Sequence, residues 1–421
     1  MTERRIEPLA RGFDVTLELP GSKSLTNRYL LLAALASGTS TLERTLIADD
    51  VEAMLDCVIA LGAGVELSKD KTGAKIAGIA GRVPSSGRAF ARQSGTTARF
   101  IAPVLGVADG PWELDGSPQL RARPMADLFS AMRRLGAEIS ATGVSLSLPV
   151  TIRGPLTGGS TTVAGAVSSQ FLSGLLLAAP LLPTGLVVEV EGVLVSRPYV
   201  EMTLATMRRF GAHVEDDGTY FSVKPTGYSA AAIAIEPDAS SASYFFAAAA
   251  CHGGTVRIPG LGRDSLQGDV RFVDVLEQMG AEVYRDASFI EVRGGPGLHG
   301  VDVDLGGLSD TVPTLAVVAA LADTPTRIRG VGFIRNKESD RIGGVVAELQ
   351  RCGIDAVEEP DGLLIRPGVP HAASVHTYDD HRMAMAFSVL GLGTEGIVIE
   401  GAESVAKSFP DFFSTLELLG S

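Results

Sequence analysis

Hydrophobic and polar positions follow a pattern that recurs along the chain. Long apolar runs such as Tyr29–Ala36 predict buried helices, and alternating segments such as Val15–Leu19 predict strands. In each cycle a strand, a helix, a strand, a second helix and another strand follow one another, with room for one further strand. Strands and helices that alternate in this way indicate an α/β fold in which helices cover sheets.

A glycine closes the second helix of every cycle. It stands at positions 62, 136, 211, 280, 353 and 420, so successive copies are 67 to 75 residues apart. This place suits the residue just after a helix, where glycine adopts a positive φ at little cost. The regular spacing predicts six copies of one supersecondary unit.

A longer period divides the six repeats into two groups of three. The stretch Leu19–Ser24 is similar to Glu236–Ser241, and the prolines of the two stretches lie three repeats apart. We therefore expect two similar domains, residues 21–229 and residues 1–20 plus 230–421. Two short crossovers predict a hinge and a cleft between the domains, which is a usual place for a ligand.

The predicted starts of the six first helices are unusually polar. They are Ser22–Arg28, Gln93–Arg99, Ser168–Gln170, Asp238–Ser241, Ser309–Asp310 and Asp379–Arg382. The simpler interpretation is six capped helices, because serine, threonine and aspartate are preferred caps. Capping does not require Lys23, Arg28, Gln170, His381 or Arg382. Since helix N-termini attract anions, we expect these starts to converge on a shared anion site.

The loops that follow the second strands add further cations. The cationic residues of these loops are Arg121, Arg123, Arg197, Arg335, Lys337, Arg341 and Lys407. A single charged loop is usually only solvated, but four cationic loops at equivalent places favour the anion site.

Composition narrows the class of protein. The chain has 421 residues, of which 45% are hydrophobic and 20% charged, as in an ordinary globular protein. A formal net charge of −13 argues against nucleic acid and anionic membranes as partners. Cys57, Cys251 and Cys352 fit neither a metal site nor a disulfide pattern, so we expect a cytoplasmic protein. We predict no signal peptide and no membrane span.

Several motifs, in order over essentially the whole chain, resemble one family. They are Pro20–Ser24 with Arg28, Ser94–Arg99, Arg123–Met125, Lys337–Arg341, Asp379–Met385 and Lys407–Asp411. The resemblance is to the EPSP synthases, the 3-phosphoshikimate 1-carboxyvinyltransferases. It implies an inside-out α/β barrel of six units that joins phosphoenolpyruvate to the 5-hydroxyl of shikimate 3-phosphate and releases phosphate. It implies no cofactor and no metal, and inhibition by glyphosate; we expect a monomer.

The resemblance also implies roles for individual residues. Shikimate 3-phosphate would bind Lys23, Ser24, Arg28, Ser168, Ser169, Gln170, Ser196, Tyr199, Asp310 and Lys337. Phosphoenolpyruvate would bind Lys23, Gly95, Thr96, Arg123, Gln170, Glu338, Arg341, His381, Arg382 and Lys407. Asp310 and Glu338 would be the acid–base pair, with Lys23 also able to carry protons. Gly95 would let the backbone approach the phosphate. A structural role for His381, and a capping role for Asp310, remain open alternatives.

Two positions depart from the family's pattern, and two other functions stay open. Gln93 and Phe333 stand where the family usually has asparagine, and the second of those is a shikimate-phosphate contact. The UDP-N-acetylglucosamine carboxyvinyltransferases are similar in fold, but they carry a reactive cysteine in the loop that is Leu120–Met125 here. A repeat scaffold that binds an anionic metabolite without catalysis would not depend on Asp310 or Glu338.

Overall fold

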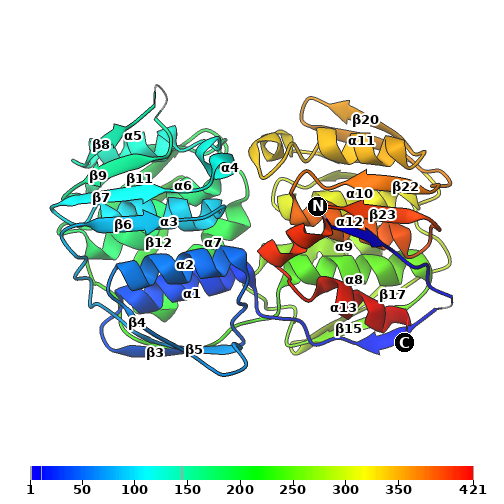
Figure 1. Ribbon diagram of the computed structural model, residues 1–421, viewed down its shortest axis with the longest axis horizontal. Coiled ribbons are helices and arrows are strands. Elements are labelled where there is room, and N and C mark those ends of the chain that lie inside the picture. Colours follow the sequence, from blue (N-terminus) through cyan, green and yellow to red (C-terminus); the bar gives the residue numbers. More distant parts are fainter. Residues whose placement is uncertain (1, 11, 144–145, 421) are drawn as a thin grey trace. The chain divides into compact units, whose positions relative to one another are not determined.

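The computed structural model describes residues 2–10, 12–143 and 146–420, which divide into two compact domains (Figure 1). The first domain is Gly21–Ile235; the second contains the residues up to Pro20 and those from Glu236 onward. The predicted boundary at residue 229 was six residues early, because strand β14 (Ala232–Ala234) pairs with β3 (Thr39–Glu43) of the first domain. The hinge and the cleft stay predictions.

Three buried helices form the centre of the first domain. They are α1 (Lys23–Leu35), α3 (Gly95–Leu105) and α6 (Ser169–Ala178), and α3 packs against both of the others. These helices are apolar on nearly all sides, which is why they lie in the core. The second helices of the repeats are α2 (Asp49–Ala60), α5 (Ala126–Arg134) and α7 (Arg197–Arg209), and a short helix α4 (Pro118–Arg121) precedes α5.

Each repeat of the first domain contributes a four-stranded sheet with one parallel and two antiparallel pairings. The strand orders are β14-β3-β5-β4, β6-β7-β9-β8 and β10-β11-β13-β12. The remaining strands are β4 (Gly64–Leu67), β5 (Gly73–Ala77), β6 (Gly87–Phe90), β7 (Pro111–Asp115), β8 (Glu138–Ala141), β9 (Val150–Arg153), β10 (Gly159–Ala164), β11 (Leu186–Glu191), β12 (Val214–Asp216) and β13 (Tyr220–Val223). The predicted space for one further strand is therefore filled.

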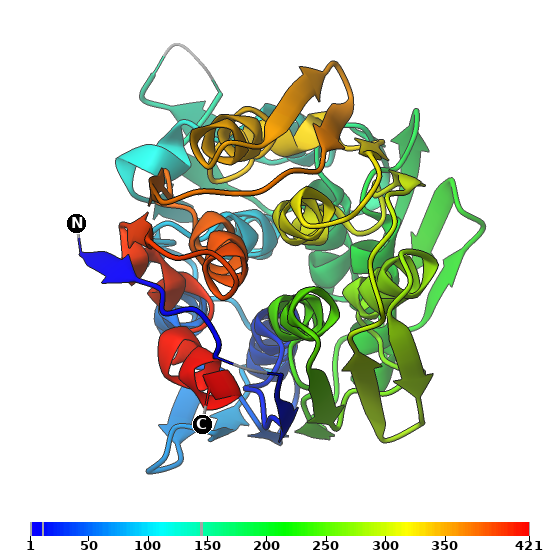
Figure 2. The same cartoon turned by 90° about the vertical axis from the view of Figure 1, so that its right-hand side faces the viewer.

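The second domain repeats this plan. Its first helices are α8 (Ala239–His252), α10 (Val312–Ala320) and α12 (His381–Gly391), which pack against one another. Figure 2 shows them at the centre of this domain with the sheets outside, the inside-out arrangement that the resemblance implied. The second helices are α9 (Phe272–Gln278), α11 (Gly343–Arg351) and α13 (Phe412–Glu417). Single 3-10 turns include Ser309–Thr311, Gly332–Asn336, Ala402–Lys407 and Leu418–Gly420.

The N-terminal segment completes two sheets of the second domain. Strand β2 (Asp14–Thr16), shorter than the predicted Val15–Leu19, gives the order β2-β15-β17-β16, and β1 (Glu3–Arg5) joins the three-stranded β1-β23-β22. The third sheet has the order β18-β19-β21-β20. The other strands are β15 (Thr255–Pro259), β16 (Glu282–Arg285), β17 (Phe289–Arg293), β18 (Asp302–Asp304), β19 (Thr326–Arg329), β20 (Asp355–Glu359), β21 (Gly362–Arg366), β22 (Ala373–His376) and β23 (Ile397–Glu400).

Five of the six repeat glycines behave as the spacing predicts; Gly420 instead ends the 3-10 turn Leu418–Gly420 and has no positive φ. Gly62, Gly136, Gly211, Gly280 and Gly353 all have positive φ, between 84° and 112°, immediately before the next strand or turn. A side chain at such φ would be strained, which explains why glycine recurs at these five helix ends.

Candidate active site

Most first helices carry side-chain caps at their N-termini, as the simpler interpretation of their polar starts predicted. The capping residues are Ser22, Ser94, Ser168, Asp238 and Asp380, each accepting a hydrogen bond from a backbone N–H of the first turn. Helix α10 instead begins through the 3-10 turn that contains Asp310. The caps leave the cations and amides of these starts available for contacts between helices.

In the first domain, the starts of α3 and α6 meet through Gln170. The Gln170 Nε2 donates to Oγ1 of Thr96 at 3.0 Å, and Nη1 of Arg99 donates to Oε1 of Gln170 at 2.6 Å. Arg99 also donates to the carbonyl of Pro124, next to Arg123, at 3.1 Å. The predicted convergence of helix starts therefore holds within this domain, and Ser168 and Ser169 lie beside Gln170 at the same start.

Lys23 is anchored by a residue that the sequence did not single out. Its Nζ lies 3.1 Å from Oδ2 of Asp50, whose side chain is 5% exposed. The Asp50 carbonyl accepts from Oγ1 of Thr97 at 3.3 Å, so the start of α2 joins those of α1 and α3. An acidic residue in the first turn of a helix is ordinary, and no sequence signal marked Asp50 as part of the site.

Gly95 and Arg123 lie against each other. A Cβ added at Gly95 would stand 2.6 Å from Nη1 and 2.7 Å from Cζ of Arg123. A side chain at this position would therefore move the Arg123 guanidinium from the place that it occupies beside Gly95. The sequence predicted a glycine here so that the backbone could approach a bound phosphate. The structure adds a contact within the protein, between Gly95 and the guanidinium of Arg123.

Arg28 is buried and joins α1 to α7. Its three nitrogens donate to the carbonyl of Ser24 at 2.9 Å, the carbonyl of Tyr199 at 2.9 Å and Oγ1 of Thr203 at 2.8 Å. Burial lowers the pKa of Arg28 to about 10. Ser196, with φ 52°, turns the chain immediately before α7 begins. Four predicted ligands of shikimate 3-phosphate therefore lie on one connected set of contacts.

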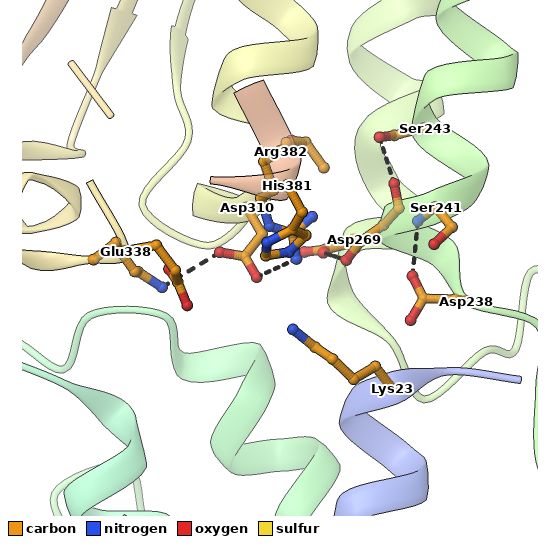
Figure 3. Close-up of polar contacts among 12 residues, drawn as sticks. Lys23, Asp238, Ser241, Ser243, Asp269, Asp310, Glu338, His381 and Arg382 are labelled. Atoms are coloured by element: carbon orange, nitrogen blue, oxygen red, sulfur yellow. Dashed lines mark hydrogen bonds and ion pairs between the residues drawn. The ribbon is translucent and has the colours of Figure 1, made fainter. Parts of the chain in front are cut away.

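In the second domain, Asp310 is the centre of a charged cluster (Figure 3). Its Oδ1 accepts from Nζ of Lys337 at 3.3 Å and from Nη1 of Arg341 at 3.1 Å. Its Oδ2 accepts from Nη2 of Arg382 at 2.6 Å. Three charge-assisted hydrogen bonds, two from the loop Lys337–Arg341 and one from α12, orient this carboxylate and bring the starts of α10 and α12 together.

Arg341 connects Asp310 to two further carboxylates. Its Nη2 donates to Oε2 of Glu338 at 2.9 Å, and its Nε donates to Oδ2 of Asp380 at 2.8 Å. Burial opposes the charge of Arg341, but the carboxylates of Asp380, Glu338 and Asp310 together raise its pKa above the usual value. Asp380 belongs to the motif Asp379–Met385, but the sequence did not indicate it as part of the site. In the structure it accepts hydrogen bonds from both Nε and Nη2 of Arg341.

Lys337 lies among charges of both signs. Burial lowers its pKa; Asp310 opposes that shift, while Arg341 adds to it. The ring of Phe333, one of the departures from the family pattern, lies 5.9 Å from the Lys337 ammonium. The ring offers this ammonium an apolar and weakly cation-attracting surface.

His381 and Lys407 are both buried, and His381 adjoins this cluster through Asp380. His381 is 1% exposed and its Nδ1 lies 3.7 Å from Oδ1 of Asp380. Lys407 is 5% exposed and ends the 3-10 turn that packs on α12. Tyr244 of α8, which the sequence did not indicate, accepts from Nη1 of Arg382 at 3.4 Å. All three first helices of the domain therefore contact Arg382 or its neighbours.

Comparison with known proteins identifies the family. The model of EPSP synthase (3-phosphoshikimate 1-carboxyvinyltransferase) matches residues 12–416. The chain belongs to the EPSP synthase family. It is 45% identical to a 3-phosphoshikimate 1-carboxyvinyltransferase of Trichormus variabilis, over 97% of both chains, and 41% identical to one of Serratia proteamaculans, over 95% of both. EPSP synthases catalyse enolpyruvyl transfer in the shikimate pathway.

The fold agrees with this family. An EPSP synthase structure from Acinetobacter baumannii aligns with a TM-score of 0.85 and 28% identity, over all of this chain and 98% of that one. In the described part of the chain, no group of three or more His, Cys, Asp or Glu residues could hold a metal ion. Among the same residues, no helix has the length and apolar character to cross a membrane.

Proposed function

We propose that this chain transfers the enolpyruvyl group of phosphoenolpyruvate to the 5-hydroxyl of shikimate 3-phosphate and releases phosphate, with Asp310 and Glu338 moving the protons. Membership of the EPSP synthase family supports the reaction. The observation that carries the residue assignment is the pair of hydrogen bonds from Arg341 to Asp310 and to Glu338. This pair places two carboxylates on opposite ends of one guanidinium.

The first domain supplies the anchors for shikimate 3-phosphate in this proposal. They are Lys23, Ser24, Arg28, Ser168, Ser169, Gln170, Ser196 and Tyr199, and Asp310 and Lys337 of the second domain complete the set. The contacts of Arg28 with Ser24 and Tyr199, and the start of α6 at Ser169, support a common location for these groups. Hydroxyl and amide donors at two helix starts suit a phosphate ester with several hydroxyls.

Phosphoenolpyruvate carries a phosphate and a carboxylate, so it needs cations and backbone N–H groups. The proposed ligands are Lys23, Gly95, Thr96, Arg123, Gln170, Glu338, Arg341, His381, Arg382 and Lys407. The contact between Gly95 and Arg123 supports the proposed ligands of the first domain. In the second domain, Arg341 and Arg382 both donate to Asp310, which supports a common location for these two cations. Guanidinium groups bind phosphate and carboxylate oxygens in pairs, which fixes orientation as well as charge.

The proposed chemistry is addition followed by elimination. Asp310 accepts the proton of the 5-hydroxyl while the oxygen bonds to C2 of phosphoenolpyruvate, and Glu338 donates a proton to the C3 methylene. In the elimination, the Glu338 carboxylate takes a proton back from C3 of the tetrahedral adduct as the bond from C2 to the phosphate oxygen breaks, which restores the double bond and the acid form of Glu338. We assign stabilisation of the leaving phosphate to the ammonium of Lys23, which pairs with Asp50 at 3.1 Å.

Cellular location and oligomeric state stay predictions: a monomer in the cytoplasm. The three cysteines are free thiols, and burial raises the pKa of Cys57, Cys251 and Cys352 to about 12 each. Unpaired, inert thiols support a reducing compartment.

The test is phosphate release from phosphoenolpyruvate by the purified chain, with shikimate 3-phosphate, with UDP-N-acetylglucosamine, or with neither. We expect release only with shikimate 3-phosphate. Release with the UDP sugar would favour the related carboxyvinyltransferase, whose loop cysteine has no counterpart in Leu120–Met125. Binding without release would favour the non-catalytic scaffold.

A further inference from the structure

Glu348 in α11 is a buried carboxylate that the proposed reaction does not use; its exposed fraction is 0%. It stands five residues before a repeat glycine. At the same place the other repeats have Cys57, Ala131, Thr206, Val275 and Thr415, none of which is charged. A buried carboxylate is costly unless hydrogen bonds and an opposite charge compensate for lost hydration. Only this repeat has a charged residue at this position; the other five repeats of the chain have small neutral side chains there.

The partners of Glu348 lie on the segment that leads into α12. Its Oε1 accepts from the hydroxyl of Tyr378 at 2.8 Å, and its Oε2 accepts from the backbone N–H of His376 at 3.0 Å. Arg351, on the same helix, donates from Nε to Oε2 at 2.9 Å. Burial and the Glu348 carboxylate raise the pKa of Tyr378 to about 12, so the phenol stays a donor well into the alkaline range.

The segment held by Glu348 has a strained backbone. Tyr378 and Asp379 both have left-handed φ, 55° and 54°. Such conformations are uncommon for residues other than glycine and persist only where surrounding contacts impose them. The next residue is Asp380, which is buried and accepts from Arg341 and from Oγ of Ser339 at 2.9 Å. The left-handed conformations of Tyr378 and Asp379 therefore set the position from which Asp380 accepts the hydrogen bond of Arg341.

We propose that Glu348 is a positioning residue for enolpyruvyl transfer: by holding Tyr378, it fixes the left-handed turn that sets Asp380 against Arg341 and starts α12 at His381. The inference rests on the proposed function of Arg341 and Arg382 as phosphoenolpyruvate ligands. It connects α11, which follows the Lys337–Arg341 motif, to the start of α12 through a contact outside both motifs. Neither Glu348 nor Tyr378 touches the proposed reacting atoms.

The test compares Tyr378→Phe with the wild-type chain in steady-state assays with each substrate varied. The substitution removes one hydrogen bond to a carboxylate and keeps the ring that packs 4.7 Å from His376. We expect the KM for phosphoenolpyruvate to rise about tenfold, the effect of losing one charge-assisted hydrogen bond. The KM for shikimate 3-phosphate should rise much less, because most of its proposed ligands, Arg28 among them, lie in the first domain and keep their contacts. Glu348→Gln should shift the same constant, and the double variant should be little worse than either single one.

The matched control is Leu276→Ala, which removes a fully buried side chain of α9 in the same domain. It should lower the Tm without a selective change in either KM. An unchanged KM for phosphoenolpyruvate in Tyr378→Phe overturns the inference, and so does an equal rise in both constants or the same rise in Leu276→Ala. If Glu348→Gln does not fold, Tyr378→Phe decides alone. An active wild-type chain with an unaffected Tyr378→Phe variant overturns only this inference, whereas an inactive wild-type chain overturns the proposed function as well.

Discussion

Asp310 and Glu338 accept hydrogen bonds from the two terminal nitrogens of the same guanidinium. Nη1 of Arg341 lies 3.1 Å from Asp310, and Nη2 lies 2.9 Å from Glu338. Arg341 is 1% exposed, and Asp380 fixes it from below through Nε. A buried, planar cation of this kind holds two carboxylates at a constant separation. That arrangement keeps the two carboxylates of the proposed proton transfers side by side.

Asp310→Asn should lower kcat strongly. The amide keeps the size of the carboxylate, but it cannot accept a proton from the 5-hydroxyl, and it weakens the bonds from Lys337 and Arg382. Loss of a general base is expected to lower kcat by roughly 10²- to 10⁴-fold. The measurement is phosphate release at saturating substrates. The control is Asp323→Asn, an exposed carboxylate of the same domain paired with His299; a kcat for Asp310→Asn as high as that of this control would contradict the assignment.

Gly95→Ala should weaken phosphoenolpyruvate binding. The added Cβ would stand 2.6 Å from Nη1 of Arg123 and must displace the guanidinium. Displacing one charged ligand is expected to raise the KM for phosphoenolpyruvate about tenfold and to weaken inhibition by glyphosate. Gly297→Ala is the control, because nothing lies within 4 Å of its added Cβ. Glyphosate inhibition that is equal in wild type and Gly95→Ala would remove the basis for placing the phosphate of phosphoenolpyruvate here.

Lys337 should give shikimate 3-phosphate binding an alkaline pH dependence. Burial lowers its pKa from 10.5, so its charge is lost at a lower pH than that of a solvated lysine. The KM for shikimate 3-phosphate should therefore rise as the pH increases toward 10.5. In Lys337→Arg the rise should be smaller, since arginine stays charged throughout.

The same pKa shift fixes a sign for stability. The folded chain binds fewer protons than the unfolded chain between the lowered pKa of Lys337 and 10.5, so this group's contribution to the free energy of unfolding increases with pH across that window. Its side chain is 24% exposed, and solvent will reduce the size of the effect.

The prediction for binding has its own test. A pH profile of the KM for shikimate 3-phosphate that is identical in wild type and Lys337→Arg would exclude Lys337 as a ligand.

The fold was predictable because its signals are local. The repeat glycines, exemplified by Gly62 and Gly280, and the apolar first helices each depend on a few neighbouring residues, and they recur six times. The boundary was missed because β14 joins the sheet of β3, a long-range pairing that the order of elements does not specify. Strand β14 has only three residues, which is too short for an alternating hydrophobic pattern that would identify it in the sequence.

The site was predictable only in part. Motifs supplied the cations, but the carboxylates that hold them, Asp50 and Asp380, became apparent only from contacts between separate segments. Glu348 looked like an ordinary helical residue until its burial and its bond to Tyr378 were known. Long-range charge pairing follows from the packed structure and not from spacing along the chain.

The most direct test of the central claim, proton transfer by Asp310 and Glu338 in an addition–elimination, is deuterium incorporation during a reaction in D2O. The wild-type chain should place solvent deuterium in the vinyl methylene of the product, because Glu338 protonates C3 and a different proton can leave when phosphate departs. Glu338→Gln should form product roughly 10²- to 10⁴-fold more slowly. Wild-type product without deuterium, or a Glu338→Gln variant that turns over at the wild-type rate, would contradict the account.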